Sequence, residues 1–137
     1  MSSIVLDCSV TISWFMDDEK PLISLDILNK ISEIGVIVPV IWQLEVGHVL
    51  LTSERRKRIT KEQRQSALYA LNELPITIDQ SISKHVWNET IELAERYSLS
   101  LYDACYSELS LRLGLSLATF DEKLKQAAKQ AGVALII

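Results

Sequence analysis

Four acidic residues lie at the ends of apolar strands or on apolar helix faces, although they are far apart in the chain. They are Asp7, Glu45, Asp103 and Asp121. If the fold gathers them, their charges repel, because two unit charges about 4 Å apart cost about 4 kcal/mol at an effective dielectric constant of about 20. Protonation or a shared divalent cation relieves that repulsion. Carboxylates around a divalent cation suit metal-assisted phosphodiester chemistry, which is the chemistry these residues predict.

Short apolar strands and amphipathic helices alternate along the chain and must position these acids. We expect strands at 4–6, 36–39, 75–78, 115–119 and 133–137, and helices at 10–15, 21–34, 42–58, 60–74, 81–97, 101–113 and 121–131. This alternation implies a parallel sheet covered on both faces. Ligands of such sheets bind beyond the carboxyl ends of the strands. We therefore expect one α/β domain, residues 1–137, with about five mostly parallel strands.

Three of the acids have a second explanation as helix caps. Asp7 and Asp121 each follow a strand and precede a helix, and Asp is among the best N-cap residues. Asp103 stands three residues after Ser100, an arrangement that resembles a capping box with Asp in place of the usual Glu or Gln. For these three residues, capping and a functional site both remain open.

Glu45 is harder to explain as a structural residue. It shares one face of its expected helix with Trp42, Val46 and Val49. A carboxylate on such a face needs a partner, because burying an unpaired charge is costly. A salt bridge to a buried arginine is the structural alternative, but no apolar strand or helix supplies an obvious one. Glu45 therefore favours a functional site.

Four segments carry these acids in a recognisable order and spacing. They are residues 4–9 (IVLDCS), Pro39 with 44–46 (LEV), 98–104 (SLSLYDA) and 117–121 (LATFD). With these segments, essentially the whole chain resembles the PIN-domain nucleases, and most closely the VapC-type toxin ribonucleases. The resemblance implies a three-layer α/β/α fold, carboxylate-bound Mg²⁺ or Mn²⁺, RNA cleavage, a homodimer and inhibition by a small antitoxin protein.

The resemblance also assigns residues by position. Asp7, Glu45, Asp103 and Asp121 match the family's acidic quartet. Ser9 and Thr119 match hydroxyl positions near the metal. The family usually has Asn three residues after the Glu, whereas this chain has His48. This departure bears on the metal geometry or the pH dependence.

Other functions fit the sequence less well than a nuclease. A catalytically weak PIN-like module that binds RNA or a partner protein is the main alternative, and His48 motivates it. A phosphoacceptor signalling domain would need paired acids after the first strand, where Asp7 is instead followed by Cys8 and Ser9. Only one Glu-x-x-His step exists, at 45–48, whereas di-iron bundles use two. No His-x-x-x-His pair, Gly-x-Ser-x-Gly motif or phosphate-binding glycine loop is present.

The net charge of −4 disfavours a nucleic-acid partner at first sight. Setting aside the four candidate acids brings the net charge to zero, so a cation over them would permit an anionic substrate. The one dense basic run consists of Arg55, Arg56, Lys57 and Arg58. Cations suit a helix C-terminus, and the same run is a candidate surface for RNA or a partner.

Cysteine content and hydropathy indicate a cytoplasmic protein without a membrane span. Cys8 and Cys105 suit a reducing compartment, and each lies within two residues of a candidate acid. We expect both to be small buried residues. No signal peptide is visible, and the longest apolar stretch, residues 34–42, is about half the length of a membrane-spanning helix.

Overall fold

A computed structural model describes residues 3–16 and 22–136, with the main chain alone at Leu22. The elements are β1 (Ile4–Leu6), α1 (Cys8–Ser13), α2 (Leu22–Ile34), β2 (Val36–Val38), α3 (Val40–Arg55), α4 (Lys61–Asn72), β3 (Ile76–Ile78), the 3₁₀ helix η1 (Ile82–Lys84), the π-helix η2 (Val86–Thr90), α5 (Ile91–Tyr97), α6 (Leu101–Leu113), β4 (Ser116–Ala118) and α7 (Glu122–Gln130). None of the described helices is long and apolar enough to cross a membrane.

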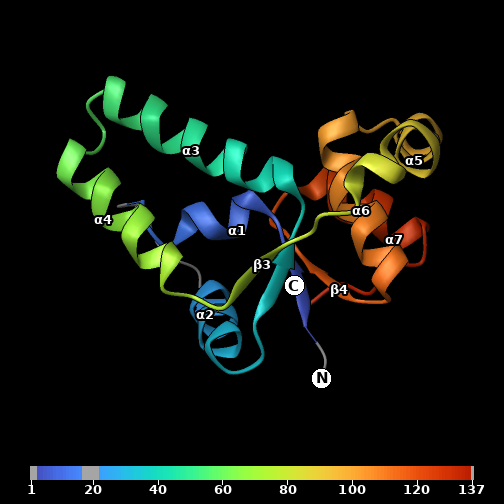
Figure 1. The fold of residues 1–137 in the computed structure, drawn as a ribbon, viewed down its shortest axis with the longest axis horizontal. Helices are drawn as coiled ribbons and strands as arrows, with labels where there is room; N and C mark the ends of the chain where they lie inside the picture. The colour runs from blue at the N-terminus through green and yellow to red at the C-terminus, as the bar shows by residue number, and fades with distance from the viewer. Residues whose placement is uncertain (1–2, 17–21, 137) are drawn as a thin grey trace.

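The strands form one parallel sheet in the order β3-β2-β1-β4. The central strand β1 is buried along its whole length, which explains its uninterrupted apolar sequence. Helices lie on both sides of the sheet, with α1 to α4 on one side and α5 to α7 on the other (Figure 1). The predicted three-layer α/β/α fold and the parallel sheet are confirmed.

The expected fifth strand is the first correction. Residues 133–136 make only an isolated parallel bridge, in which Leu135 pairs with Leu117. The Leu117 N–H donates to the Ala134 carbonyl at 2.9 Å, and the Ile136 N–H donates to the Leu117 carbonyl at 3.0 Å. Gly132, with a positive φ of 92°, turns the chain back towards β4 before this bridge. The sheet therefore has four strands rather than five, and Ile137 lies outside the described residues.

The expected single helix over 81–97 is the second correction. This segment is divided into η1, η2 and α5. The Thr90 N–H reaches back five residues to the His85 carbonyl at 3.1 Å, which inserts one extra residue into the turn. That extra residue lets Thr90 be fully buried while Trp87 is 82% exposed. β-Branched residues and Asn weaken the α-helical preference of this stretch, so the irregular turn costs little.

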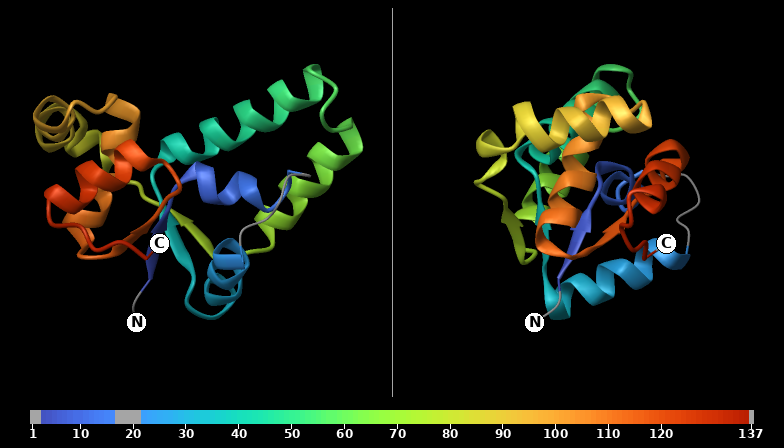
Figure 2. Two further views of the ribbon diagram at one scale, coloured as in Figure 1. Left: turned by 180° about the vertical axis from the view of Figure 1, so that it is seen from behind. Right: turned by 90° about the vertical axis from the view of Figure 1, so that its right-hand side faces the viewer.

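Helices α3 and α4 project from the sheet as a hairpin of two helices (Figure 2). At the base of the projection, the Trp42 indole N–H donates to the Thr11 hydroxyl at 3.0 Å and so fastens α3 to α1. Near the tip, an ion pair joins Glu54 on α3 to Arg64 on α4. The start of α3 is thus fixed against the rest of the fold, and Glu45 lies in the next turn of the same helix.

Candidate acidic active site

The register of two neighbouring strands brings the first and last candidate acids to one edge of the sheet. Leu6 of β1 pairs with Ala118 of β4, and the Asp7 N–H donates to the Ala118 carbonyl at 2.9 Å. Asp7 and Thr119 therefore leave adjacent parallel strands at their carboxyl ends. Asp121 follows two residues later, at the start of α7.

Asp7 is a buried acid held by two hydroxyl groups. Its Oδ2 accepts hydrogen bonds from Ser9 Oγ at 2.6 Å and from Thr119 Oγ1 at 2.7 Å. Asp7 occupies the N-cap position of α1, but its side chain makes no capping hydrogen bond there. Burial raises the pKa of Asp7, and the bonds from Ser9 and Thr119 offset part of that rise. This carboxylate is therefore held chiefly by the two hydroxyl groups rather than by a standard capping hydrogen bond.

The two hydroxyls are oriented by backbone donors. Ser9 Oγ accepts from the Phe120 N–H at 2.9 Å, and Thr119 Oγ1 accepts from the Asp121 N–H at 3.0 Å. Because each hydroxyl accepts from a backbone N–H, its single hydrogen is directed to Asp7. The structure thus places Ser9 and Thr119, both predicted as site residues, in contact with an acid of the quartet.

Glu45 lies half-buried on α3 and is tied to α6. The Tyr106 hydroxyl donates a hydrogen bond to Glu45 Oε1. Burial raises the pKa of Glu45, and the negative charges of Asp7 and Asp103 raise it further, while the bond from Tyr106 lowers it. The pKa of Tyr106 is itself raised, chiefly by burial and next by the charge of Asp7.

Tyr106 was missed by the sequence analysis. The available signal was its spacing: Tyr106 stands three residues after Asp103, so both residues lie on one face of a helix. A tyrosine in an otherwise buried stretch requires a partner for its hydroxyl. Glu45, a carboxylate on an apolar helix face, was the complementary signal.

Asp121 caps a helix, whereas Asp103 lies in the first turn of a helix that Ser100 caps, so the capping box expected there is not formed. Asp103 is in the first turn of α6, and its N–H donates to Ser100 Oγ at 3.0 Å. Oδ1 of Asp121 accepts from the Leu124 N–H at 3.1 Å, so the capping prediction for Asp121 is confirmed. Burial raises the pKa of Asp103, and the charges of Asp121 and Asp7 raise it further; Ser100 and Lys123 lower it.

The four acids therefore influence one another electrostatically at one edge of the fold. Among the described residues, however, no group of three or more His, Cys, Asp or Glu side chains is arranged to hold a metal ion. The chemistry of the donors still fits a hard divalent cation, which prefers carboxylate oxygens. The acids that would supply those oxygens are Asp7, Glu45, Asp103 and Asp121. Their mutual repulsion is what such a cation would relieve.

The other predicted residues lie outside this set of contacts. His48 is exposed on α3, one turn beyond Glu45. The basic residues Arg55, Arg56, Lys57 and Arg58 are exposed at the tip between α3 and α4. Ten residues of helix separate Glu45 from the start of this run, which corresponds to about 15 Å. The basic run is thus too far from Glu45 to contact the same small ligand, but one extended RNA strand could contact both.

The two cysteines are buried and free, as expected. Burial, followed by the charges of Glu45 and Asp7, raises the pKa of Cys8 to about 12. Burial, followed by the charge of Glu108, raises the pKa of Cys105 to about 11. Thiols with such pKa values are poor nucleophiles and metal ligands at neutral pH.

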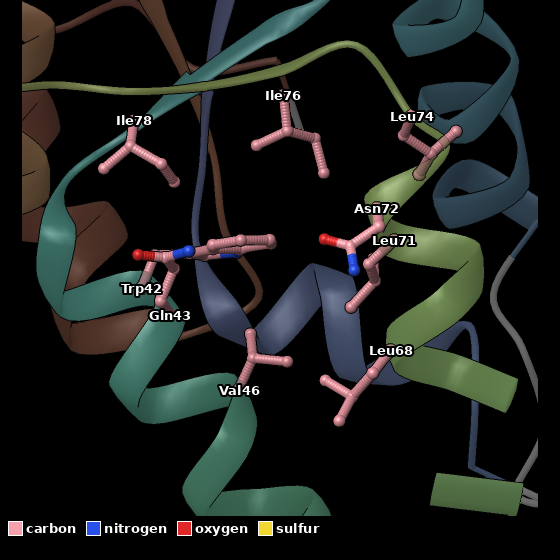
Figure 3. Close-up of a pocket in the computed structure, with 9 residues that line it drawn as sticks. All are labelled: Trp42, Gln43, Val46, Leu68, Leu71, Asn72, Leu74, Ile76 and Ile78. Atoms are coloured by element: carbon pink, nitrogen blue, oxygen red, sulfur yellow. The ribbon is translucent and has the colours of Figure 1, made fainter. Parts of the chain in front are cut away.

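An apolar cavity of about 440 Å³ lies between α3, α4 and β3 (Figure 3). Trp42, Val46, Leu71 and Ile76 are among the residues that line it. None of the four acids belongs to its lining. The cavity is therefore a feature separate from the acidic site.

Comparison with known proteins identifies the family. The sequence model of the PIN domain family matches residues 4–130, so the chain belongs to this family. A search of curated protein sequences finds no significant match.

Solved structures with the same fold come from bacteria and an archaeon. PAE2754 from Pyrobaculum aerophilum has a TM-score of 0.69 at 19% identity and covers 98% of this chain and 91% of its own. The structure of VapBC2 from Rickettsia felis, which is bound to a DNA fragment from the VapBC2 promoter, has a TM-score of 0.69 at 16% identity over 96% of both chains. FitAcB from Neisseria gonorrhoeae has a TM-score of 0.67 at 16% identity over 98% of this chain and 96% of its own. At these identities, the likeness establishes the fold.

Proposed function

We propose that this PIN-domain protein is a divalent-metal-dependent endoribonuclease and the toxin of a toxin–antitoxin pair. The observation that carries the proposal is the arrangement of acids at the carboxyl edge of the sheet. Burial and neighbouring negative charges raise the pKa of Glu45 and Asp103. The causes that shift the pKa of Glu45 include no positive side chain of the described residues, and Lys123 partly offsets the shift at Asp103. Buried acids without a compensating arginine suit a site that receives a cation.

In this proposal, Asp7, Glu45 and Asp103 are the main metal ligands, and Asp121 completes the set or orients water. A bound Mg²⁺ or Mn²⁺ supplies a water of lowered pKa and offsets charge on the phosphate oxygens. Ser9 and Thr119 hold the Asp7 carboxylate by the hydrogen bonds described above. The chain's own contribution is to keep these oxygens oriented at one edge of the fold.

The first experiment measures cleavage of a mixed RNA pool by the wild-type protein with Mg²⁺ and with EDTA, and by Asp7→Asn with Mg²⁺. Altering a group that only orients a metal ligand typically costs 10–100-fold, so we expect Asp7→Asn to lower the rate by at least about 100-fold. The matched control is Asp26→Asn, because Asp26 is an exposed acid on α2. Cleavage at one rate in every sample would refute the nuclease proposal.

The partners follow from the resemblance to VapC-type toxins. We propose a small antitoxin protein and a homodimer; the shared fold with VapBC2 and FitAcB supports the antitoxin, and the homodimer rests on the resemblance alone. Expression together with the neighbouring genes of its operon, followed by purification and mass measurement, tests both partners. Recovery of the chain alone as a monomer would argue against them.

The basic run of Arg55, Arg56, Lys57 and Arg58 is a second proposed contact with RNA. It is exposed at the tip of the α3–α4 hairpin, where it can neutralise phosphates of a strand that also reaches the acids. Replacing all four residues by Gln is expected to weaken RNA binding and reduce its dependence on salt. Unchanged RNA affinity would show that this basic run does not bind RNA.

A catalytically weak binding module is the second candidate function. Two observations favour it: His48 replaces the usual Asn, and the described residues contain no assembled metal-ligand group. Calorimetric titration with Mn²⁺ separates the candidates. The nuclease proposal expects measurable binding, whereas absence of heat at millimolar Mn²⁺ would favour the binding module.

A further inference from the structure

Tyr106 reaches the acidic site from the interior of the protein. Its side chain is fully buried on α6, and its hydroxyl donates to Glu45 Oε1 on α3, 61 residues away in sequence. Asp103 precedes it by one helical turn, so a single face of α6 delivers both an acid and this hydroxyl. Tyr106 therefore connects the two helices that supply Glu45 and Asp103.

Glu45 depends on a single long-range contact. Asp7 has two side-chain partners, Ser9 nearby in sequence and Thr119 112 residues away, and Asp121 is held by the Leu124 N–H of its own helix. Within the described structure, Tyr106 is the one group that hydrogen-bonds the Glu45 carboxylate. Because Glu has one more rotatable bond than Asp, it loses more conformational freedom when it is held in place.

A tyrosine holds a carboxylate differently from a basic residue. Its hydroxyl is neutral and donates a single hydrogen bond. It can thus fix Oε1 of Glu45 while leaving the negative charge of the carboxylate, and the second oxygen, available to a cation. An arginine or lysine at the same place would neutralise the charge that the cation needs.

We infer that Tyr106 is a positioning residue that orients the Glu45 carboxylate for a divalent cation. The inference rests on the proposed function, since orientation of Glu45 has this purpose only if the acids bind metal. The competing explanation is purely structural: a buried tyrosine hydroxyl requires a hydrogen-bond partner, and Glu45 provides one. The two explanations differ in what happens to metal affinity when the hydroxyl is removed.

The test is the variant Tyr106→Phe, which removes only the hydroxyl. Calorimetric titration with Mn²⁺ alone measures its dissociation constant, and thermal unfolding in EDTA measures its stability. Because groups that orient a metal ligand are worth about 10–100-fold in affinity, we expect the Mn²⁺ dissociation constant to rise at least about tenfold. The matched control is Ser107→Ala, which removes a buried hydroxyl from the same helix that has no hydrogen-bond partner within the described structure. Its Mn²⁺ affinity should equal that of the wild type.

The outcomes separate this inference from the proposed function. If the wild type binds Mn²⁺ and Tyr106→Phe binds it equally well, the role of Tyr106 is overturned while the metal site stands. If the wild type binds no Mn²⁺ and cleaves no RNA, the proposed function fails and takes this inference with it. A loss of affinity in Ser107→Ala equal to that in Tyr106→Phe would show a general packing effect and overturn the inference.

A measurement on the wild-type sequence covers the case in which Tyr106→Phe does not fold. The protein is labelled with 3-fluorotyrosine, and the signals of its four tyrosines are followed by fluorine NMR during a Mg²⁺ titration. Replacing Tyr69, Tyr97 and Tyr102 by Phe, one at a time, assigns the remaining signal to Tyr106. That signal should shift with the same saturation as the calorimetric binding. A Tyr106 signal that does not move at saturating Mg²⁺ would overturn the inference.

Discussion

Two groups of acids in this protein are similarly buried but are stabilised in opposite ways. Asp79 and Glu108 are 7% and 3% exposed, and Asp7 is 5% exposed. Arg112 binds both members of the first group: its Nη2 lies 2.8 Å from Asp79 Oδ2, and its Nε lies 2.8 Å from Glu108 Oε2. Asp7 is bonded instead by the neutral hydroxyls of Ser9 and Thr119.

The pKa directions follow from this difference. Hydrogen bonds from Arg112 hold the pKa of Asp79 below its usual value, whereas burial holds the pKa of Asp7 above it. In the first group the positive charge of Arg112 partly balances the two carboxylates within the fold, and these ion pairs contribute to stability. At Asp7 no cation of the described residues makes a contact that compensates the buried charge, and that burial costs stability. The comparison therefore predicts that the two groups respond oppositely to substitution.

The largest expected change in stability comes from Arg112→Met. It leaves Asp79 and Glu108 buried without a cation, and breaking a buried pair by removing one partner typically costs about 3–5 kcal/mol. Since the Arg112 side chain is 19% exposed, we expect about 3 kcal/mol, measured by urea denaturation at pH 7. Arg96→Met, at an exposed arginine on α5, serves as the control. A loss below about 1 kcal/mol would show that the triad behaves like a surface salt bridge.

The second prediction concerns pH and compares Asp7→Asn with Asp79→Asn, both in EDTA. Because the folded pKa of Asp7 is raised, the folded protein keeps a proton that the unfolded chain has already lost above its model value of 3.8. The unfolding free energy of the wild type should therefore fall relative to Asp7→Asn as pH rises from about 4 towards neutrality. Asp7→Asn is thus expected to be at least as stable as the wild type at pH 7.

Asp79 should show the opposite sign. Its folded pKa is lowered, so its stabilising contribution is present above the unfolded model value of 3.8 and is lost as pH falls through the folded pKa. Asp79→Asn should be less stable than the wild type at pH 7, and the difference should shrink towards pH 3. Urea denaturation across pH 3–7 measures both curves. Parallel curves for the two variants would remove the distinction between the two groups of acids.

The sequence predicted where the candidate acids lie in the fold because their positions are set by local rules. Asp7 and Asp121 follow apolar strands, and parallel strands necessarily end at the same edge. Glu45 was predicted from the apolar face of its own helix. In each case, a pattern within about ten residues, combined with the parallel sheet, was sufficient to place the residue.

The partners that distinguish the two groups could not be predicted in the same way. Tyr106 meets Glu45 across 61 residues, and Arg112 meets Asp79 across 33 residues. These contacts depend on how α6 packs against α3 and against the loop after β3, which no local pattern determines. The π-helix at Val86–Thr90 was missed for a related reason, because burial of Thr90 against the fold decides it rather than helix periodicity.

The smallest effect on stability is expected at Asp121, which is both a helix cap and a member of the candidate acidic site. Its carboxylate caps α7 through the Leu124 N–H, and its charge also acts on Asp103. Asn caps a helix about as well as Asp, whereas Ala costs about 1 kcal/mol at an N-cap. We therefore expect Asp121→Ala to lower the unfolding free energy by about 1 kcal/mol and Asp121→Asn to change it by less than about 0.5 kcal/mol.

RNA cleavage distinguishes the two roles of Asp121 because Asn retains the cap and loses the charge. If Asp121 completes the metal site or orients water, Asp121→Asn should reduce cleavage by about tenfold or more while remaining as stable as the wild type. Thr60→Ala removes the capping box of α4 and provides the reference for a loss of stability caused by capping alone. If Asp121→Asn cleaves RNA at the wild-type rate while Asp121→Ala loses the expected unfolding free energy, Asp121 acts only as a helix cap. The acidic site would then consist of Asp7, Glu45 and Asp103.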